Sequence, residues 1–581
     1  MNVNPVVSEI VSGALRSLEE EIEDLLARTW RSPALRDTRD FSVGLYDRFG
    51  RALTGRILGV GPGPVLGSFS AGEMAPGDVF LHNDPYLPPA GLGEVAELCL
   101  TRPLFEGGRL IAFLQVRGRH DDLGGNLPGG GAAGARESYH EGLLIPPVRI
   151  VRSGQRVEDI QTLLLRNSRF PDTLRDDIDA QAAALQVGSI RIRELVDRYG
   201  SEQLTACFAD LLRECEVAFK EELLPQIPEK PRKVKAQVET DGFGGPHPLQ
   251  VTIFRDGDRL IVDLAGAGPQ ALGPINCPLE GEGKLSLARL ISPLLLHLAY
   301  DPDRMAGILL NDGACRAIDI RLPGPGTLIT PRFPAPTGLR ALTLGKLLSA
   351  FAEALFYATG GKTPAGFDNL RSWSLWGNGG GSAPFLFRES LGSGSGASPG
   401  FDGIPGVPPI GGTGGMPVEV VEARYPIRIE SAGLTPDSGG AGQHRGGPGT
   451  YREYRLLAPG DVSSAAGSGE AGPFGGKGGG PGAPYRATRS GTSGKARKMP
   501  SLSPAEPFSA GDLLRVETPG GGGWGSAEKR DPEAVRLDVL QGIVSRERAK
   551  DVYRVALGRA PGHEVNLEET LKLRKKKPGK K

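Results

Sequence analysis

The sequence has little cysteine, and what it has is scattered. It contains five cysteines in 581 residues, namely Cys99, Cys207, Cys215, Cys277 and Cys315, and no two form a CxxC pair. An odd number of isolated cysteines argues against a disulfide scaffold and against a cysteine-rich zinc site. We therefore predict reduced thiols and a cytoplasmic protein.

Charge of one sign and long apolar runs are also missing. Lys and Arg number 68, Asp and Glu also number 68, and the formal net charge is zero. No overall attraction to nucleic acid or to an anionic membrane is expected. The start, "MNVNPVVSEI", has no basic segment followed by an apolar one, and no run of 18 apolar residues follows anywhere. A signal peptide and a membrane span are therefore not predicted.

The sequence contains partial matches to nucleotide-binding and nucleophile motifs, but no complete one. "GGKTP" at 360–364 has the end of a phosphate loop, but Phe356 stands where that loop needs a glycine. "GASPG" at 396–400 lacks the strand and helix that flank a nucleophilic serine. "PGGGGWG" at 519–525 either presents backbone N–H groups to an anion or forms a tight turn under Trp524, and we favour the turn. No ATP site is predicted in this chain.

Glycine and proline are abundant, at 86 and 49 residues, and they cluster. Apolar spacing predicts helices near 5–30, 175–199, 202–223, 283–299 and 340–358, and "VTIFRDGDRLIVDLAG" predicts a hairpin. Segments 377–416 and 467–500 are expected to be long loops or disordered. The fold class is mixed, α+β, in several layers. We predict an N-terminal α/β region carrying the site (1–225), a hairpin-plus-helix region (226–375), a glycine-rich β/loop region (376–560) and a basic disordered tail (561–581).

An ordered set of motifs carries a resemblance. It includes "RDFSVGLYDRFGR", "GDVFLHNDPY", "RHDDLGG", "YHEGLLIPPVRI", "PRFPAP", "PVEVVEARYPIRIE", "PDSGGAGQHRGGPG" and "TPGGGGWG". From about residue 5 to about residue 557, the chain resembles the hydantoinase B / 5-oxoprolinase family. This family includes N-methylhydantoinase B subunits and the related subunits of acetone and acetophenone carboxylases.

The resemblance implies an activity and a partner. Members work beside an A-type subunit that binds ATP and phosphorylates an oxygen of the substrate, after which the B part completes ring opening or carboxylation. The leading prediction is therefore the B-type subunit of an ATP-dependent hydrolase of cyclic amides, in a hetero-oligomer acting on a small molecule. Two alternatives stay open: a ketone carboxylase subunit, and a catalytically silent scaffold for an A-type partner.

The resemblance also implies a metal site, and this sequence departs from it. Family members usually read like "NDPYxGGTHxxD" and "HHADVGG", whose histidines and carboxylates hold Zn, Mn or Fe. Here Gly91 stands in place of the histidine, Glu94 in place of the aspartate, and Arg119 in place of the first histidine of the second motif. An upstream "HxPVH" segment reads "GVGPGPVLGS", without histidine.

The remaining candidates define the predicted site. The metal ligands are Asp84, Glu94, His120 and Asp122; the catalytic residues are His120, Asp122 and Arg119; the substrate-binding residues are Asn83, His140 and Glu141. One histidine with carboxylates suits a hard ion such as Mn²⁺ or Mg²⁺ better than zinc. Three outcomes stay open: a bound divalent metal, an arginine-based anion site without metal, or a site that has lost its function.

Overall fold

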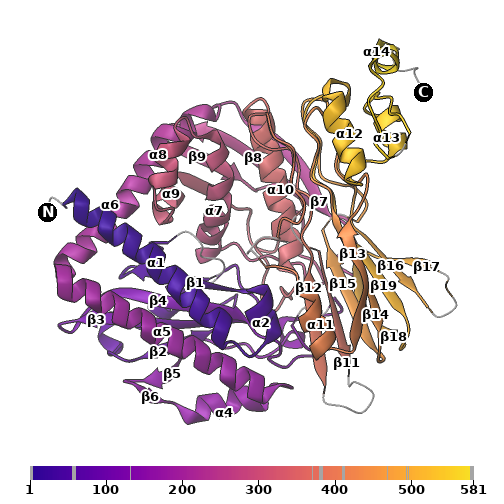
Figure 1. Ribbon diagram of the computed structural model, residues 1–581. Helices are drawn as coiled ribbons and strands as arrows, with labels where there is room; N and C mark the ends of the chain where they lie inside the picture. Colours follow the sequence, from indigo (N-terminus) through magenta and orange to yellow (C-terminus); the bar gives the residue numbers. More distant parts are fainter. Residues whose placement is uncertain are drawn as a thin grey trace. The chain divides into compact units, whose positions relative to one another are not determined.

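Figure 1 shows the fold of the chain in a computed structural model. It describes residues 4–54, 60–89, 91–130, 133–368, 371–377, 384–408, 413–467, 469–491, 494, 496–559 and 561–575. The chain divides into two compact units, Met1–Leu348 and Ser349–Lys581. The regions predicted from the sequence, with boundaries near residues 225, 375 and 560, stay predictions.

A six-stranded antiparallel sheet is the centre of unit 1. Its order is β1-β4-β3-β2-β5-β6. The strands are β1 (Phe41–Asp47), β2 (Val79–His82), β3 (Glu97–Glu106), β4 (Arg109–Arg119), β5 (Val148–Arg152) and β6 (Gln155–Arg156). β1 pairs with β4, not with the segment after its own turn, where Tyr46 and Ala52 form a single bridge. The turn at residues 48–50 therefore does not join two paired strands.

Two long helices cover one face of this sheet (Figure 1). They are α1 (Pro5–Thr29) and α5 (Pro171–Tyr199), as the apolar spacing predicts. In α1, Val11, Leu15, Leu18 and Ile22 recur every three or four residues and are all buried. Asn4 caps the helix by accepting a hydrogen bond from the Val6 backbone N–H. The same apolar core includes the inward side chains of β1, β3 and β4.

The rest of unit 1 is a second sheet with surrounding helices. The sheet has the order β10-β9-β8-β7, with strands β7 (Arg232–Val238), β8 (His247–Asp256), β9 (Arg259–Asp263) and β10 (Ile318–Arg321). β8 and β9 form the predicted hairpin. The helices are α2 (Pro33–Thr38), α3 (Gly63–Ser68), α4 (Glu158–Arg166), α6 (Ser201–Ala218), α7 (Glu282–Leu295), α8 (Pro302–Gly307) and α9 (Asp312–Arg316). Helix α10 (Arg340–Ala358) begins in unit 1 and continues past its last residue, Leu348.

Helix α10 and the cysteines bear on the compositional predictions. Among the described residues, α10 alone has the length and apolar composition of a membrane-crossing helix, and 67% of its apolar window is buried inside the structure. That burial is typical of a core helix. All five cysteines are buried, and none is bridged.

Unit 2 contains two antiparallel sheets whose apolar faces share one core. The first is β12-β11-β15-β18 and the second is β13-β14-β19-β16-β17. Trp373 and Phe387 of the first sheet pack with Tyr454 of the second, at ring-centroid distances of 4.5 and 6.3 Å. The elements are β11 (Arg371–Gly377), β12 (Phe385–Ser390), α11 (Val418–Arg424), β13 (Ile427–Leu434), β14 (Thr450–Leu456), β15 (Gly460–Ala466), β16 (Arg486–Ser490), β17 (Ala496–Met499), β18 (Leu502–Phe508) and β19 (Leu513–Glu517).

The glycine-rich segments of unit 2 form a backbone-bonded bundle. Gly521, Gly522 and Gly523 donate N–H bonds of 2.9 Å to the carbonyls of Gly447, Gly366 and Gly480 respectively. A Cβ on Gly521 would lie 1.7 Å from the Ser395 carbonyl oxygen. Glycine is required here because the chains approach each other more closely than any side chain permits. The long loops predicted over 377–416 and 467–500 are present in most of the described residues there, outside β12, β16 and β17. The hydrogen bonds of the bundle hold these loops in place.

The C-terminal segment is helical where disorder was expected. It contains α12 (Pro532–Leu540), α13 (Arg546–Asp551) and α14 (Leu567–Lys575), and residues 576–581 lie outside the described part. Arg574 in α14 donates a 2.6 Å hydrogen bond to the Arg530 carbonyl. Arg530 in turn pairs with Asp538 at 2.8 Å. Basic composition alone does not show these tertiary contacts, which order the helix.

Candidate functional site

Part of the second face of the six-stranded sheet is polar although it is buried. Strand alternation sends Ser42, Glu97, Thr101, Gln115 and Arg117 to this face, and each is at most 6% exposed. Gln115 donates a 2.9 Å hydrogen bond to Thr101 and accepts one of 3.1 Å from the Tyr46 hydroxyl. Burying polar groups costs free energy unless they are hydrogen-bonded. A network of this kind therefore marks the face as a candidate site.

His82 lies on the same face and is shielded from solvent. It is 1% exposed, and burial lowers the pKa of its imidazole to about 4. The ring is therefore neutral at neutral pH. It lies opposite Cys99 in the β2–β3 pairing, and burial raises the pKa of that thiol to about 12. Neither group carries charge near pH 7.

A buried ionic cluster occupies one end of this face. Glu94 bonds Arg119 through one carboxylate oxygen and Arg340 through the other, the second at 2.5 Å. Glu97 likewise bonds Arg117 with one oxygen and Arg340 with the other, at 2.8 Å. We call these five residues the arginine–glutamate cluster. Burial by itself would raise the pKa of Glu97, but Arg117 and Arg340 hold it below its ordinary value.

Local structure explains how the cluster assembles. Glu97 begins β3 opposite Arg119, which ends β4, so the strand register brings them together. Arg340 begins α10, more than 200 residues later in the chain. Asp40 lies 3.8 Å from Arg117 at the edge. The side chains are 6–10% exposed except that of Arg119, at 22%, so Arg119 is the member that reaches toward solvent.

Glu141 holds a neighbouring loop to the segment before α10. Its carboxylate accepts backbone N–H bonds from Thr337 at 3.0 Å and Gly338 at 2.7 Å. Ser138 and Tyr86 both donate to the Ala335 carbonyl, at 2.9 and 2.6 Å. Burial raises the pKa of Glu141 to about 8, against the lowering effect of the two N–H groups. This side chain therefore takes up a proton near neutral pH.

A pH-dependent stability follows from Glu141. Between the ordinary value of 4.5 and about 8, the folded chain retains a proton that the unfolded chain has lost, so stability falls as pH rises through this range. Relative to Glu141→Gln, the wild type should lose on the order of 4 kcal/mol between pH 5 and 8, since one pKa unit corresponds to about 1.4 kcal/mol. Urea unfolding at several pH values measures this. Glu106→Gln, on a partly exposed carboxylate of β3, is the control and should follow the wild type; parallel curves for Glu141→Gln and wild type would contradict the assignment.

The predicted metal ligands do not come together. His120 follows β4 but turns to the helix-covered face, where its Nε2 lies 3.0 Å from Gln181 Oε1 of α5 and its ring packs edge-on against Trp30. Glu94 lies on the opposite face, with the arginines. Asp122 is held by Arg169 at 2.8 Å. Among the described residues, no three His, Cys, Asp or Glu side chains are placed to hold a metal ion.

The other predicted residues also have structural contacts. Asp84 accepts the Tyr86 backbone N–H at 2.8 Å. The Asn83 carboxamide donates to the carbonyls of Val95 and Leu143 and accepts the backbone N–H of Ile145, which ties three loops together. His140 Nδ1 accepts the Arg136 backbone N–H at 3.2 Å. Of the predicted set, the structure thus unites Glu94 with Arg119. The catalytic and substrate-binding roles stay predictions.

Sequence reasoning missed three members of the cluster, Glu97, Arg117 and Arg340. A signal for one of them was present: in "LQVRGR", Gln115, Arg117 and Arg119 alternate with Leu114, Val116 and Gly118. That alternation predicts one polar face on a strand. Nothing in the sequence relates Arg340 to it, because the contact depends on where α10 begins in space.

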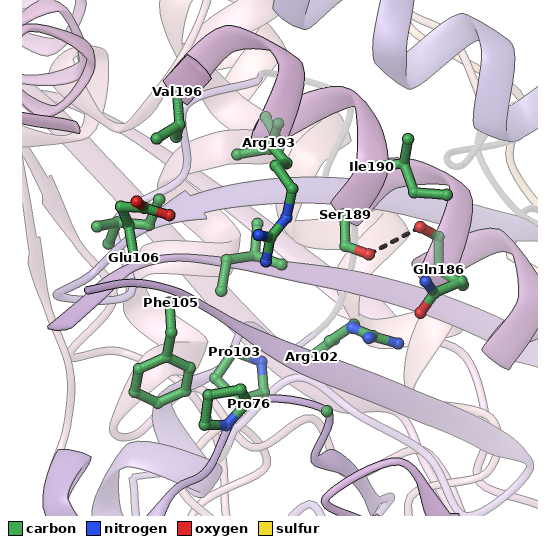
Figure 2. A pocket seen from close by; sticks show the side chains of 14 residues that line it. Pro76, Arg102, Pro103, Phe105, Glu106, Gln186, Ser189, Ile190, Arg193 and Val196 are labelled. Carbon is green, nitrogen blue, oxygen red and sulfur yellow. Dashed lines mark hydrogen bonds between the residues drawn. The ribbon is translucent and has the colours of Figure 1, made fainter. Parts of the chain in front are cut away.

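A separate hollow lies on the helix-covered side, at the far end of β3 and β4 (Figure 2). It has a volume of about 140 Å³ and lies between α5 and the β3–β4 hairpin. Arg102 of β3 and Arg193 of α5 line it together with Glu106. Burial lowers the pKa of the Arg102 guanidinium. Because this hollow is at the opposite end of the strands, it is distinct from the arginine–glutamate cluster.

The fold and site define a large α+β protein whose buried ionic site lies between one sheet face and the loops before α10. The chain belongs to the Hydantoinase B/oxoprolinase family, whose sequence pattern matches residues 4–527. It is 29% identical to a putative B subunit of a D-/L-hydantoinase from Pseudomonas sp. (strain NS671), over 99% of this chain and 98% of that protein.

Two solved structures are similar in fold. One is the ATP-dependent caprolactamase from Pseudomonas jessenii, with a TM-score of 0.84 and 27% identity, covering 99% of this chain and all of that one. The other is acetone carboxylase in a nucleotide-free state, with a TM-score of 0.85 and 18% identity, covering 98% of this chain and 82% of that one. At that identity the second likeness concerns the fold alone. The mixed α+β class and the predicted family are confirmed.

Proposed function

We propose that this chain is the B-type subunit of an ATP-dependent hydrolase of cyclic amides. The observation that carries the proposal is the end-to-end likeness to the ATP-dependent caprolactamase, at a TM-score of 0.84 over 99% of this chain. The hydantoinase relative is also described as a B subunit. We expect the ATP chemistry to belong to an A-type partner, because this sequence carries no recognised nucleotide motif.

The proposed reaction uses the partner to activate the amide. Phosphorylation of the amide oxygen withdraws electrons from the ring carbon, so water adds there and cleavage of the C–N bond leaves an acyl phosphate. A second water then hydrolyses the acyl phosphate. The products are ADP, phosphate and the ring-opened amino acid, or the carbamoyl amino acid when the substrate is a hydantoin. In this proposal Arg119, the most exposed member of the cluster, faces the anionic phosphorylated substrate, and a guanidinium suits this role because it binds phosphate through paired N–H donors.

Turnover by the two-subunit complex tests the proposal. With the A-type partner present, hydantoin, 5-oxoproline or caprolactam should stimulate ADP release and give ring-opened product, and neither subunit alone should do so. Arg119→Met should reduce product formation roughly 100-fold or more, the range found when a group that stabilises developing charge is removed. Arg102→Met, in the hollow of Figure 2, is the matched control and should retain turnover.

The other outcomes separate the alternatives. Turnover of acetone or acetophenone with bicarbonate, without turnover of any cyclic amide, would replace the proposal by a carboxylase subunit. Ring opening by the A-type partner alone, at the rate of the complex, would reduce this chain to a scaffold.

A further inference from the structure

Two of the positions that depart from the family's metal motif are bonded to each other. Glu94 stands in place of the aspartate and Arg119 in place of a histidine, and the Arg119 guanidinium binds one oxygen of Glu94. The other oxygen binds Arg340 at 2.5 Å. Both oxygens of Glu97 are bound to arginines in the same way. The carboxylates at this end of the sheet thus bind guanidinium groups where a metal site would need them as ligands.

Position 91, where the first motif has a histidine, has no room for a side chain. A Cβ built on Gly91 would lie 2.3 Å from the backbone N of Gly283, 2.6 Å from its Cα and 2.8 Å from the Glu280 carbonyl oxygen. These are backbone atoms, which cannot move aside as the end of a flexible side chain can. No histidine fits at position 91 without rebuilding the segment 280–283.

In the upstream segment, where the family has histidines and this chain has none, the backbone packs against a carboxylate. Gly61 donates its N–H to Glu282 at 2.8 Å, and a Cβ on Gly63 would lie 2.0 Å from the same carboxylate. Glu282 is partly buried and begins α7. The upstream loop thus offers no histidine ligand, and its two glycines lie against the carboxylate of Glu282.

From these contacts we infer that the guanidinium groups of Arg119 and Arg340 take the place of a divalent metal ion, so the site of this chain is metal-independent. The positive charge that a metal would supply is already present, bound to the carboxylates and fixed in sign at every physiological pH. A divalent cation among three guanidinium groups is repelled. The inference concerns the chain's own ion pairs, and it stands whether or not the proposed reaction is correct.

Elemental analysis and thermal unfolding of the full-length chain, alone and with its A-type partner, test the inference without measuring turnover. After dialysis against Mn²⁺, Zn²⁺ or Fe²⁺ and removal of free ion, the wild-type chain should hold far less than one metal ion per chain. EDTA should leave its melting temperature unchanged. One ion per chain that EDTA removes, with a fall in melting temperature, would overturn the inference, because a bound ligand stabilises the folded state. Separate analysis of the partner assigns any metal to its subunit.

Arg119→His makes the test sharper because it restores one histidine of the family motif. It should still bind no metal, since position 91 is closed and Glu94 stays on Arg340. Arg102→His, on the other face of the sheet, is the matched control for adventitious binding to an added histidine. If Arg119→His gains one ion per chain and Arg102→His does not, the cluster is a metal site lacking one ligand, and the inference fails. The wild-type measurement stands by itself if Arg119→His does not fold.

Discussion

Gly521→Ala should unfold the glycine bundle of unit 2. The added Cβ would lie 1.7 Å from the Ser395 carbonyl oxygen and 2.1 Å from its carbon. Both are backbone atoms in a neighbouring segment of the bundle, so the segments must separate and the Gly521 N–H bond to Gly447 is lost. We expect the free energy of unfolding to fall by about 3 kcal/mol or more, at or beyond the upper end of the losses found for overpacked cores. Urea unfolding followed by tryptophan fluorescence measures it, since three of the four tryptophans belong to unit 2.

Gly414→Ala is the matched control in the same unit. Nothing lies within 4 Å of the place its added methyl group would take, and its backbone is outside the left-handed region. The free energy of unfolding of this variant should lie within about 0.5 kcal/mol of the wild-type value, as is usual for a substitution away from closely packed residues. A Gly521→Ala protein as stable as Gly414→Ala would show that the bundle is not closely packed.

Arg340→Met should be the most destabilising single change in the arginine–glutamate cluster. Arg340 alone contacts both carboxylates, at 2.5 Å to Glu94 and 2.8 Å to Glu97. Its loss leaves each buried carboxylate with one arginine in place of two. Breaking a buried ion pair by removing one partner costs about 3–5 kcal/mol. Urea unfolding at pH 7 measures the loss.

The pH dependence identifies the cause. Because the folded pKa of Glu97 is lowered, its contribution is present above its ordinary value of 4.5 and is lost as pH falls through the folded value. The difference in free energy of unfolding between the wild type and Arg340→Met should therefore become smaller as the pH is lowered below 4.5. Arg332→Met, on an exposed arginine of the preceding loop, is the control and should match the wild type. A deficit independent of pH would indicate lost packing and not lost charge.

The predicted helices were recovered because their signals are local. In α1, α5, α6, α7 and α10 the apolar residues recur at helical spacing, and a buried stripe of that kind requires only one long segment and a partner surface. The β8–β9 hairpin follows in the same way from Asp256 and Gly257 at its turn. Composition predicted the loops of the glycine-rich segments but not their packing, because that packing comes from hydrogen bonds between segments far apart in the chain.

The same distinction between local signals and long-range contacts applies to the candidate site. By itself, the sequence determined the family, the polar alternation of β4 and the loss of the motif's histidines, since each is a matter of which residue stands at which position. Only the tertiary structure decided that Arg119 and His120 face opposite sides of the sheet. It also decided that Arg340 forms ion pairs with both Glu94 and Glu97. Adjacent residues at a strand end point in opposite directions, and a charge brought in from a distant helix is set by packing, which no local pattern encodes.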